Sequence, residues 1–516
     1  MKARRHAGGP AVRRGCVAAA VIAAACAVEP RAPTALDASG DTSEADDRAP
    51  SIDREEDPSR ADAAVADAQD APYDHAALPV DLGPLVPRCE PGTVVACPCT
   101  NGAGGAQRCG ATGTYEPCAC DAGSSDGGAP SPGFVEVAVG IFDTCARRAD
   151  GSVYCWGATV RHKNGFRAIR LVPVQMTELE GVVALGSSRC AIRSDGAALC
   201  WSCDGCLGSS QPVDPDPVPR VVPGVAGVVA VSHHAGTCYL RREGPPLCFG
   251  YTLLPGVRPD GERMNYHTPT ALVGVERVAQ LAGDGNTMCA RTVEGQVWCW
   301  GAGDTSLGDG LTSRAETCLD PNDDSVPSLR RRVDCTTTPV RVTGVSDARS
   351  LVGGLTAYRA IGAHFCVLRA SGQVLCWGHN NAGQLGDGTI DSRPAPTPVA
   401  GVEAVHVATS AISTCAALRD GRVMCWGAND YGQLGDGRAD HGTRCHADDS
   451  RFTFDCSPRP VAVIGLTRIL QVSVHERHAC ALQEGGRVFC WGDNSVGQLG
   501  DDSTADSDVP VAVRAP

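Results

Sequence analysis

The stretch CAALRDGRVMCWGANDYGQLGDG, residues 415–437, contains the pattern that decides the fold. A cysteine is followed ten residues later by a second cysteine, with a glycine at the sixth position between them. This arrangement occurs seven times along the chain, and Trp-Gly follows in most copies. Such self-similarity indicates a repeat architecture. The seven pairs are Cys145 with Cys155, Cys190 with Cys200, Cys238 with Cys248, Cys289 with Cys299, Cys366 with Cys376, Cys415 with Cys425, and Cys480 with Cys490.

Each cysteine pair is expected to flank a β-hairpin. A three-residue hairpin loop ends in a left-handed residue, a conformation that is cheap only for glycine. With residues 149–151 as the loop of the first unit, Arg148 pairs with Ser152, and Cys145 lies opposite Cys155. Facing residues on antiparallel strands have Cα atoms roughly 4.5–5.5 Å apart, a separation that a disulfide spans. The spacing therefore predicts a disulfide across every hairpin.

Two further β-rich runs belong to each unit. One precedes the first cysteine, as at residues 402–407, and another begins with Pro-Val after the glycine-rich turn, as at Pro460-Val461. Four short strands per unit, repeated around an axis, form a β-propeller. We therefore predict an all-β fold, a seven-bladed β-propeller of four-stranded blades over residues 134–516.

The ends of this region suggest how the ring closes. The first unit begins at Phe134 with no Pro-Val strand before it, and the chain finishes with a spare one at residues 509–513. An open ring would leave strand edges exposed, which propellers avoid. We predict that the C-terminal strand completes the first blade and that the two ends meet.

The glycine-rich turns resemble a known repeat. They read GHNNAGQLGDG (378–388), GANDYGQLGDG (427–437) and GDNSVGQLGDD (492–502). Together with the preceding CAL-x-x-DG-x-V-x-CWG they resemble the RCC1 (regulator of chromosome condensation) repeat family, over residues 134–516. Units two and three have lost the Gln-Leu-Gly part. The resemblance implies a seven-bladed propeller that binds a protein partner, here in an exported, bacterial, disulfide-rich version.

The N-terminus predicts export. Basic residues precede a short apolar run at residues 17–25, which is typical of a signal peptide and too short to span a bilayer. Ala23-Ala24-Ala25-Cys26 resembles a lipoprotein signal with Cys26 as the lipidated residue, although ordinary signal cleavage nearby fits as well. We assign residues 1–26 to the signal and expect either the cell envelope or the extracellular space.

Two segments separate the signal from the propeller. Residues 27–88 are rich in Asp, Glu, Ala and Pro, a composition that predicts a disordered acidic linker. Residues 89–120 hold six cysteines and predict a small disulfide-stapled module of undetermined connectivity, and residues 121–133 form a Gly/Ser linker. Without Cys16 and Cys26, 26 cysteines remain, an even number that allows complete pairing.

Units four and six are lengthened at the same position. An insert with Cys318 and Cys335 follows LGDG at 307–310, and another with Cys445 and Cys456 follows LGDG at 434–437. We predict that each insert closes as a disulfide-pinned loop on one face, where loops carry specificity. A zinc site from His441, Cys445, His446 and Cys456 is the alternative, which the histidine-free insert of unit four disfavours.

Other candidate chemistry has a structural interpretation. Cys203 and Cys206 form a C-x-x-C that we interpret as a turn disulfide rather than a redox or metal site. His475 and His478 lack the helical His-Glu-x-x-His spacing of a zinc protease. Recurrent aspartates in the turns, which calcium could use, are expected to cap backbone amides. These are Asp309, Asp387, Asp436 and Asp501.

The aromatic residue after the second cysteine recurs in every unit, which indicates packing between blades rather than stacking on sugars. The residues are Trp156, Trp201, Phe249, Trp300, Trp377, Trp426 and Trp491. We predict no catalytic residue, no cofactor and no metal, and a non-enzymatic extracytoplasmic scaffold whose face loops bind a protein. Most of the net charge of −14 lies in the acidic linker, so the folded part is near neutral and nothing favours nucleic acid as a partner. Contact with a membrane is expected only through a lipid anchor.

Two alternatives stay open. The first is a lectin-like binder of envelope or extracellular glycan, for which loop tyrosines are the candidate residues. The second, a propeller-type lyase or hydrolase, requires histidine and acidic residues of different blades to converge on one face. The candidate tyrosines are Tyr251, Tyr266, Tyr358 and Tyr431.

Overall fold

The structure is a computed structural model. It describes residues 94–98, 104–108 and most of 133–516. The gaps within the last range are 159–160, 163–164, 167–168, 187–188, 202–217, 234–235, 253–263, 284–285, 304, 320–331, 355–363 and 447–452. The predicted signal, Cys26, the acidic linker and most of the six-cysteine module lie outside the described residues. Within that module, β1 (Val94–Pro98) and β2 (Gly104–Arg108) form an antiparallel hairpin.

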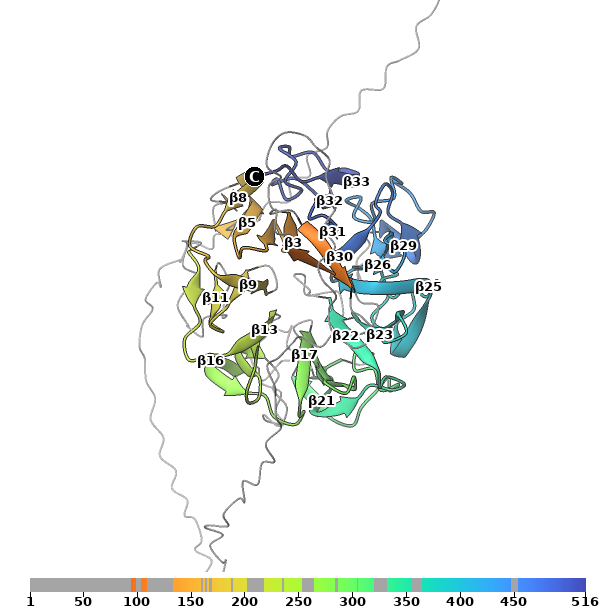
Figure 1. The fold of residues 1–516 in the computed structure, drawn as a ribbon. Coiled ribbons are helices and arrows are strands. Elements are labelled where there is room, and N and C mark those ends of the chain that lie inside the picture. Colours follow the sequence, from red (N-terminus) through yellow and green to blue (C-terminus); the bar gives the residue numbers. More distant parts are fainter. Residues whose placement is uncertain are drawn as a thin grey trace, which may run out of the picture. The chain divides into compact units, whose positions relative to one another are not determined.

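The remaining strands form seven four-stranded antiparallel units, the blades, in chain order (Figure 1). Blade 1 contains β3 (Phe134–Val139), β4 (Asp143–Arg148), β5 (Val153–Ala158) and β8 (Ile169–Gln175). Blade 2 contains β9 (Val182–Leu185), β10 (Cys190–Arg193), β11 (Ala198–Cys200) and β12 (Arg220–Val221). Blade 3 contains β13 (Val228–His233), β14 (Gly236–Arg241), β15 (Leu247–Thr252) and β16 (Met264–Ala271). A two-stranded ribbon, β6 (Arg161–His162) with β7 (Gly165–Phe166), lies between β5 and β8 in sequence.

Blades 4 to 7 follow the same plan. Blade 4 contains β17 (Val278–Gly283), β18 (Thr287–Thr292), β19 (Val297–Ala302) and β21 (Arg332–Arg341). Blade 5 contains β22 (Ala348–Gly353), β23 (His364–Arg369), β24 (Gln373–Gly378) and the first part of β25 (Arg393–Thr409), whose second part begins blade 6. Blade 6 continues with β26 (Ser413–Leu418), β27 (Val423–Ala428) and β29 (Thr453–Ala462). Blade 7 contains β30 (Ile469–His475), β31 (His478–Gln483), β32 (Val488–Gly492) and β33 (Ser507–Ala512). The fold is therefore an all-β, seven-bladed propeller, as the repeats predict.

The second and third strands of each blade form the predicted hairpin. In blade 1 the Gly151 amide donates to the Arg148 carbonyl at 3.1 Å, and the Arg148 amide donates to the Ser152 carbonyl at 2.9 Å. Gly151 has φ +86°, and the equivalent glycines of the other six blades lie between +80° and +92°. The strands therefore pair around the three-residue loop in the register that the spacing predicts.

All seven hairpin pairs are disulfide-bonded, with Cα separations of 4.0–4.1 Å. In each blade the two cysteines face one another directly in the register of the second and third strands. The separations are slightly shorter than the 4.5–5.5 Å that facing residues ordinarily have. The bonded pairs are Cys145 with Cys155, Cys190 with Cys200, Cys238 with Cys248, Cys289 with Cys299, Cys366 with Cys376, Cys415 with Cys425, and Cys480 with Cys490.

Ring closure differs from the sequence prediction. Strand β33 pairs with β32 and completes blade 7, whereas the outer strand of blade 1 is β8, from the first unit itself. The prediction that the C-terminal strand completes the first blade is therefore wrong. Each unit supplies all four of its own strands, because the chain returns from the third strand to pair with it locally. The Val-Pro-Val at residues 172–174 belongs to the outer strand that the sequence prediction overlooked.

Lateral contacts between blades 7 and 1 close the ring instead. The Val137 amide donates to Gln471 Oε1, and Gln471 Nε2 donates to the Val137 carbonyl, both at 3.1 Å. The Val139 amide donates to Ser473 Oγ at 3.0 Å. The two ends do meet, since Phe134 and Val513 both bond to the hairpin at 483–488 of blade 7.

Candidate interaction face

One end of the propeller carries the long loops. In blade 7, His475 pairs with His478, His478 with Gly492, and Gly492 with Ser507. These register pairs place two connections at the same end of the blade: the turn from first to second strand, and the longer loop from third to fourth strand. Both inserts occur in the second connection, so we call this end the insert face. The glycine hairpins lie at the opposite end, the hairpin face.

The Gln-Leu-Gly turn, or its Ser-Leu-Gly equivalent in blade 4, fastens each of blades 4 to 7 to the blade that follows it. In blades 5 to 7 the carbonyl of its glutamine accepts the indole N–H of the following blade's tryptophan at 2.8–2.9 Å. In blade 4, Ser306 replaces glutamine, and its carbonyl accepts from Trp377 at 2.9 Å. The last of these bonds, from Trp156 to the Gln498 carbonyl, contributes to ring closure. The leucines of the four turns are fully buried: Leu307, Leu385, Leu434 and Leu499.

The predicted packing role of the repeated aromatic residues is what the structure shows. All seven are buried, and none is more than 3% exposed. The glycine that ends Gln-Leu-Gly lies directly against the indole. A Cβ placed on Gly435, which has φ +69°, would be 2.7 Å from Nε1 of Trp491. This position therefore requires glycine for two reasons, its backbone conformation and its neighbour.

The turn aspartates cap backbone amides, and most also bind a cationic side chain. Each accepts the N–H of the residue two positions ahead, at 2.9–3.2 Å. Beyond this cap, Arg314 donates to both oxygens of Asp309 at 2.7 Å, and Arg393 donates to Asp387 at 2.7 Å. The corresponding partner of Asp436 is His441, and Asp501 accepts from Asn494 and Ser503 instead. In blades 4 and 5 a guanidinium thus occupies the place beside the carboxylate that a calcium ion would need.

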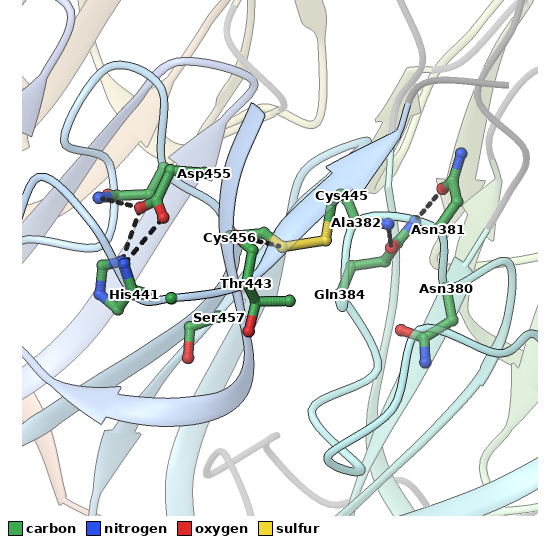
Figure 2. The surroundings of a disulfide bond; sticks show 12 residues. Asn380, Asn381, Ala382, Gln384, His441, Thr443, Cys445, Asp455, Cys456 and Ser457 are labelled. Atoms are coloured by element: carbon green, nitrogen blue, oxygen red, sulfur yellow. Dashed lines mark hydrogen bonds and ion pairs between the residues drawn. A yellow bond between two sulfur atoms is a disulfide. The ribbon is translucent and has the colours of Figure 1, made fainter. Parts of the chain in front are cut away.

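The blade 6 insert is fixed by a disulfide and by a buried histidine (Figure 2). Its strand β28 (Arg444–His446) pairs with β29, and Cys445 is bonded to Cys456, with Cα atoms 6.0 Å apart. Nδ1 of His441 lies 2.7 Å from Oδ2 of Asp455, and Nε2 lies 3.0 Å from Oδ2 of Asp436. The His441 side chain is only 4% exposed. Both cysteines are consumed by the disulfide, so the zinc alternative loses two of its four ligands.

Protonation of His441 follows from this geometry. Carboxylates only accept hydrogen bonds, so both contacts are satisfied only when both ring nitrogens carry hydrogen. Burial disfavours the charged imidazolium, but the hydrogen bonds to Asp455 and Asp436 outweigh it and raise the pKa of His441 above its ordinary value. The backbone N–H of His441 also donates to Asp455 Oδ1 at 2.8 Å. Two carboxylates therefore bind one residue from both sides.

The blade 4 insert repeats this arrangement with arginine. Its strand β20 (Thr317–Leu319) pairs with β21, and Cys318 is bonded to Cys335 with Cα atoms 5.7 Å apart. The backbone N–H of Arg314 donates to Asp334 Oδ2 at 2.8 Å, as that of His441 does to Asp455. Glu316 lies near the disulfide sulfurs, and its carboxylate accepts from the Thr337 hydroxyl at 2.7 Å.

The remaining candidates do not converge. His478 is fully buried, with Nε2 3.0 Å from the Thr144 hydroxyl of blade 1. His475 accepts the Glu476 amide on Nδ1 at 2.9 Å and lies opposite His478 in the register of β30 and β31. The Tyr431 ring is covered by the Arg477 guanidinium, 4.7 Å from the ring centroid. The other candidates lie outside the described part of the chain: Cys203, Cys206, Tyr358 and the side chains of Tyr251 and Tyr266.

The central channel contains residues that the sequence pattern did not single out. It has a volume of about 360 Å³ and is lined by the first strands of all seven blades. Polar side chains in the channel form hydrogen bonds between neighbouring blades. Glu136 Oε1 accepts the Leu185 amide at 3.1 Å, and Gln280 Oε1 accepts the Leu351 amide at 3.0 Å. Burial raises the pKa of Glu136, although Arg147 lies 2.8 Å away. The signal that could have found these residues is their common position in the first strand of each unit.

Comparison with known proteins follows the same repeats. The profile of the Regulator of chromosome condensation (RCC1) repeat matches residues 371–417, 420–482 and 485–516. A second RCC1 repeat profile matches residues 405–433 and 469–498. Residues 371–516 of the chain match RCC1 repeats. The profile matches cover blades 5 to 7, where the Gln-Leu-Gly turns are intact, and not blades 1 to 3, where they are lost.

Curated relatives share only part of their length with this chain. It is 30% identical to the ultraviolet-B receptor UVR8 of Arabidopsis thaliana over 155 residues, which are 30% of this chain and 33% of the receptor. It is 26% identical to the human E3 ubiquitin-protein ligase HERC2 over 242 residues, 46% of this chain and 4% of the ligase. The chain thus matches about a third or less of the length of these relatives.

Solved propellers resemble it more distantly. Human WBSCR16 has 19% identity and a TM-score of 0.48, covering 68% of this chain and 87% of that one. Yeast RCC1 (Prp20), in its complex with Kap60, has 16% identity and a TM-score of 0.42, covering 74% of this chain and 75% of that one. Among the described residues of the chain, no helix is long and apolar enough to cross a membrane.

Proposed function

We propose that this RCC1-repeat protein is a non-enzymatic extracytoplasmic scaffold that binds a protein partner through loops of its insert face. The observation that carries the proposal is the pair of disulfide-pinned inserts, Cys318–Cys335 and Cys445–Cys456, on alternate blades of the same face. A rigid ring that presents variable loops is a typical arrangement for recognition. The RCC1 repeats of blades 5 to 7 support the same class of function, because the family resemblance implies a propeller that binds a protein.

The inserts present polar and apolar groups together. Leu311 is 53% exposed directly after the turn of blade 4, and Ile390 is 40% exposed in the corresponding loop of blade 5. In blade 6 the Arg438 and Arg444 side chains are 70% and 55% exposed. Exposed apolar residues rimmed by charges are what a protein interface needs. We therefore place the partner over blades 4 to 6.

Export is the second part of the proposal. Nine disulfides within the described residues require an oxidising compartment to form and persist. The basic and apolar stretches of residues 1–26 fit a signal peptide, and Cys26 fits lipidation. Residues 27–88 would then tether the small module and the propeller to the envelope. Radiolabelled palmitate should be incorporated into the wild-type protein and not into a Cys26→Ser variant if Cys26 is lipidated.

Capture from an envelope extract tests the binding function. The oxidised propeller is immobilised with and without competing sugars, alongside a Leu311→Ser/Arg438→Ser variant of the insert face and an Arg422→Ser variant of the hairpin face. We expect one protein to be enriched regardless of sugar, and its capture to weaken only with the insert-face variant. Capture that a sugar abolishes would replace this proposal with a glycan-binding function.

A further inference from the structure

The two inserts are attached to their blades by the same set of contacts, which a different cationic residue makes in each insert. In each, the residue four positions after the turn's final glycine bonds to the turn aspartate and to an aspartate of the outer strand. That residue is Arg314 in blade 4 and His441 in blade 6. The outer-strand aspartates, Asp334 and Asp455, each immediately precede the second cysteine of the insert disulfide. The chain thus contains one attachment whose charge is permanent and one whose charge titrates.

We propose that His441 is a pH-operated pin: its protonated ring fastens residues 438–444 of the blade 6 insert to the ring, and loss of that proton releases them. The contacts to Asp455 and Asp436 together require the imidazolium, since both ring nitrogens must donate. The inference goes beyond the proposed function, because it concerns the insert itself and needs no partner.

The surrounding charges determine which contact breaks. Neutral imidazole keeps one N–H, and the shorter contact, Nδ1 to Asp455 at 2.7 Å, retains it. Nε2 then directs a lone pair at Asp436 across 3.0 Å, which is repulsive. Asp436 keeps other partners after this contact is lost, because it accepts the Arg438 backbone amide at 3.1 Å and lies 3.9 Å from Arg438 Nε.

Further acidic residues lie near the His441 contacts. Asp430 accepts the Asp455 amide at 3.1 Å, which adds a third carboxyl group to the cluster. From blade 7, Asp508 of β33 adjoins the same turn, where its carbonyl accepts the Gly437 amide at 3.0 Å. Figure 2 labels Asn380, Asn381, Ala382 and Gln384 of blade 5 on the other side of the insert disulfide. The nearby cations, Arg438 and Arg444, are largely exposed and so are screened by solvent.

The His441 contacts should weaken as the pH rises. A histidine whose pKa is raised on folding stabilises its contacts at low pH, and this contribution is lost as pH rises through the folded-state pKa. The pin is therefore closed at and below the ordinary histidine pKa of about 6.5 and opens toward alkaline pH. The Arg314 attachment of blade 4 stays closed throughout, because the guanidinium keeps its charge.

Hydrogen exchange of the full, oxidised chain between pH 5.5 and 9 tests the pin. Exchange at each pH is divided by the rate for an unstructured peptide, which removes base catalysis. Between the ordinary histidine pKa of about 6.5 and the raised folded-state pKa of His441, protection of 438–444 should fall by up to about tenfold per pH unit and then level off, whereas protection of 311–319 should stay constant.

Reciprocal variants provide the control. His441→Arg should abolish the pH dependence in blade 6, and Arg314→His should create it in blade 4. Equal pH dependence in wild type and His441→Arg would overturn the proposal. So would a His441 pKa below 6.5 in an NMR titration of the wild-type protein, a measurement that needs no variant to fold.

Discussion

At the scale of single residues, each residue of the turn between the third and fourth strands makes a different contact. The first glycine of Gly-Gln-Leu-Gly-Asp-Gly lies against the next blade's outer strand, as Gly432 does against Asp508. The glutamine carbonyl accepts the indole N–H, the leucine is buried, and the second glycine makes room for the indole ring. The aspartate caps the turn, and the final amide bonds to the next blade.

Substitution of the second glycine should be costly. We expect Gly435→Ala to lower the free energy of unfolding by about 2–4 kcal/mol, because it combines a left-handed backbone with overlap between the new Cβ and Trp491. Gly401→Ala is the matched control, since Gly401 has φ +75° but no atom within 4 Å of the new Cβ. It should cost about 1 kcal/mol in urea denaturation. Equal losses for the two variants would contradict the packing argument.

Substitution at the last position of the turn should increase stability in blade 7. Blades 4 to 6 end it in glycine, whereas blade 7 has Asp502 at φ +71°, with its amide donating to the Leu171 carbonyl at 3.0 Å. We expect Asp502→Gly to raise the free energy of unfolding by about 0.5–1 kcal/mol through relief of the left-handed strain. Gly437→Asp should produce the opposite change in the same denaturation assay. A destabilised Asp502→Gly would show that its side chain, rather than its backbone, determines the position.

At the scale of strands and hairpins, the two kinds of disulfide lie in different surroundings. Hairpin disulfides join the second and third strands inside the blade, and those of the inserts join a short added strand to the outer strand. Both close loops of similar length, with sequence separations of 10 in the hairpins and 11 or 17 in the inserts. Loop entropy should therefore contribute similarly in both kinds of disulfide. Any difference in their effect on stability should come from the part of the structure that each disulfide holds in place.

Removal of one disulfide of each kind separates these roles. Cys415→Ala/Cys425→Ala should lower the free energy of global unfolding by about 2–3 kcal/mol, the loop-closure value for a loop of this length. Cys445→Ala/Cys456→Ala should leave global unfolding nearly unchanged and increase hydrogen exchange in residues 438–446 only. Global destabilisation by the second variant would show that the insert belongs to the core of blade 6.

At the scale of the whole ring, buried histidines connect blades across their interfaces. His364 of blade 5 lies 2.9 Å from the Thr414 hydroxyl of blade 6, as His478 of blade 7 does from Thr144 of blade 1 at 3.0 Å. Burial lowers the pKa of each histidine to about 3, and the pKa of His406 in the channel to about 4. Three neutral histidines are therefore part of the folded ring.

These histidines predict loss of stability in acid. Their folded-state pKa values lie below the ordinary 6.5, so their contribution is complete above pH 6.5 and is lost as pH falls from there toward 3. Each histidine should add up to about 1.4 kcal/mol per pH unit to the slope. His478→Gln, which keeps a polar group facing Thr144, should reduce the slope in urea titrations between pH 7 and 4 by up to one proton. An unchanged slope would mean that His478 is protonated in the folded ring.

The sequence was informative about the parts of this architecture that are local. Cys415, Gly421 and Cys425 predict their hairpin because the turn and its pairing lie within eleven residues of each other. The closure of the ring was predicted wrongly, because a Pro-Val strand pairs equally well with the blade before it or after it, and only the three-dimensional path decides. His441 was considered only as a ligand in the disfavoured zinc alternative, and its partner Asp455 was not considered. The shared placement of Asp334 and Asp455 before the second insert cysteine was the available signal.

The closure of the ring by side-chain and amide contacts, without exchange of a strand, has a consequence for how the protein is made. Hydrogen bonds within each blade join residues close in sequence, but the seam joins residues 331 to 354 positions apart. Because synthesis begins at the N-terminus, the chain can form its first six blades one after another as an open arc. The contacts between blades 7 and 1 cannot form until blade 7 has been synthesised, and contacts between residues far apart in sequence form slowly. We therefore expect the last step of folding to be the docking of blade 7 onto blade 1, which leaves blade 1 uncovered for the longest time.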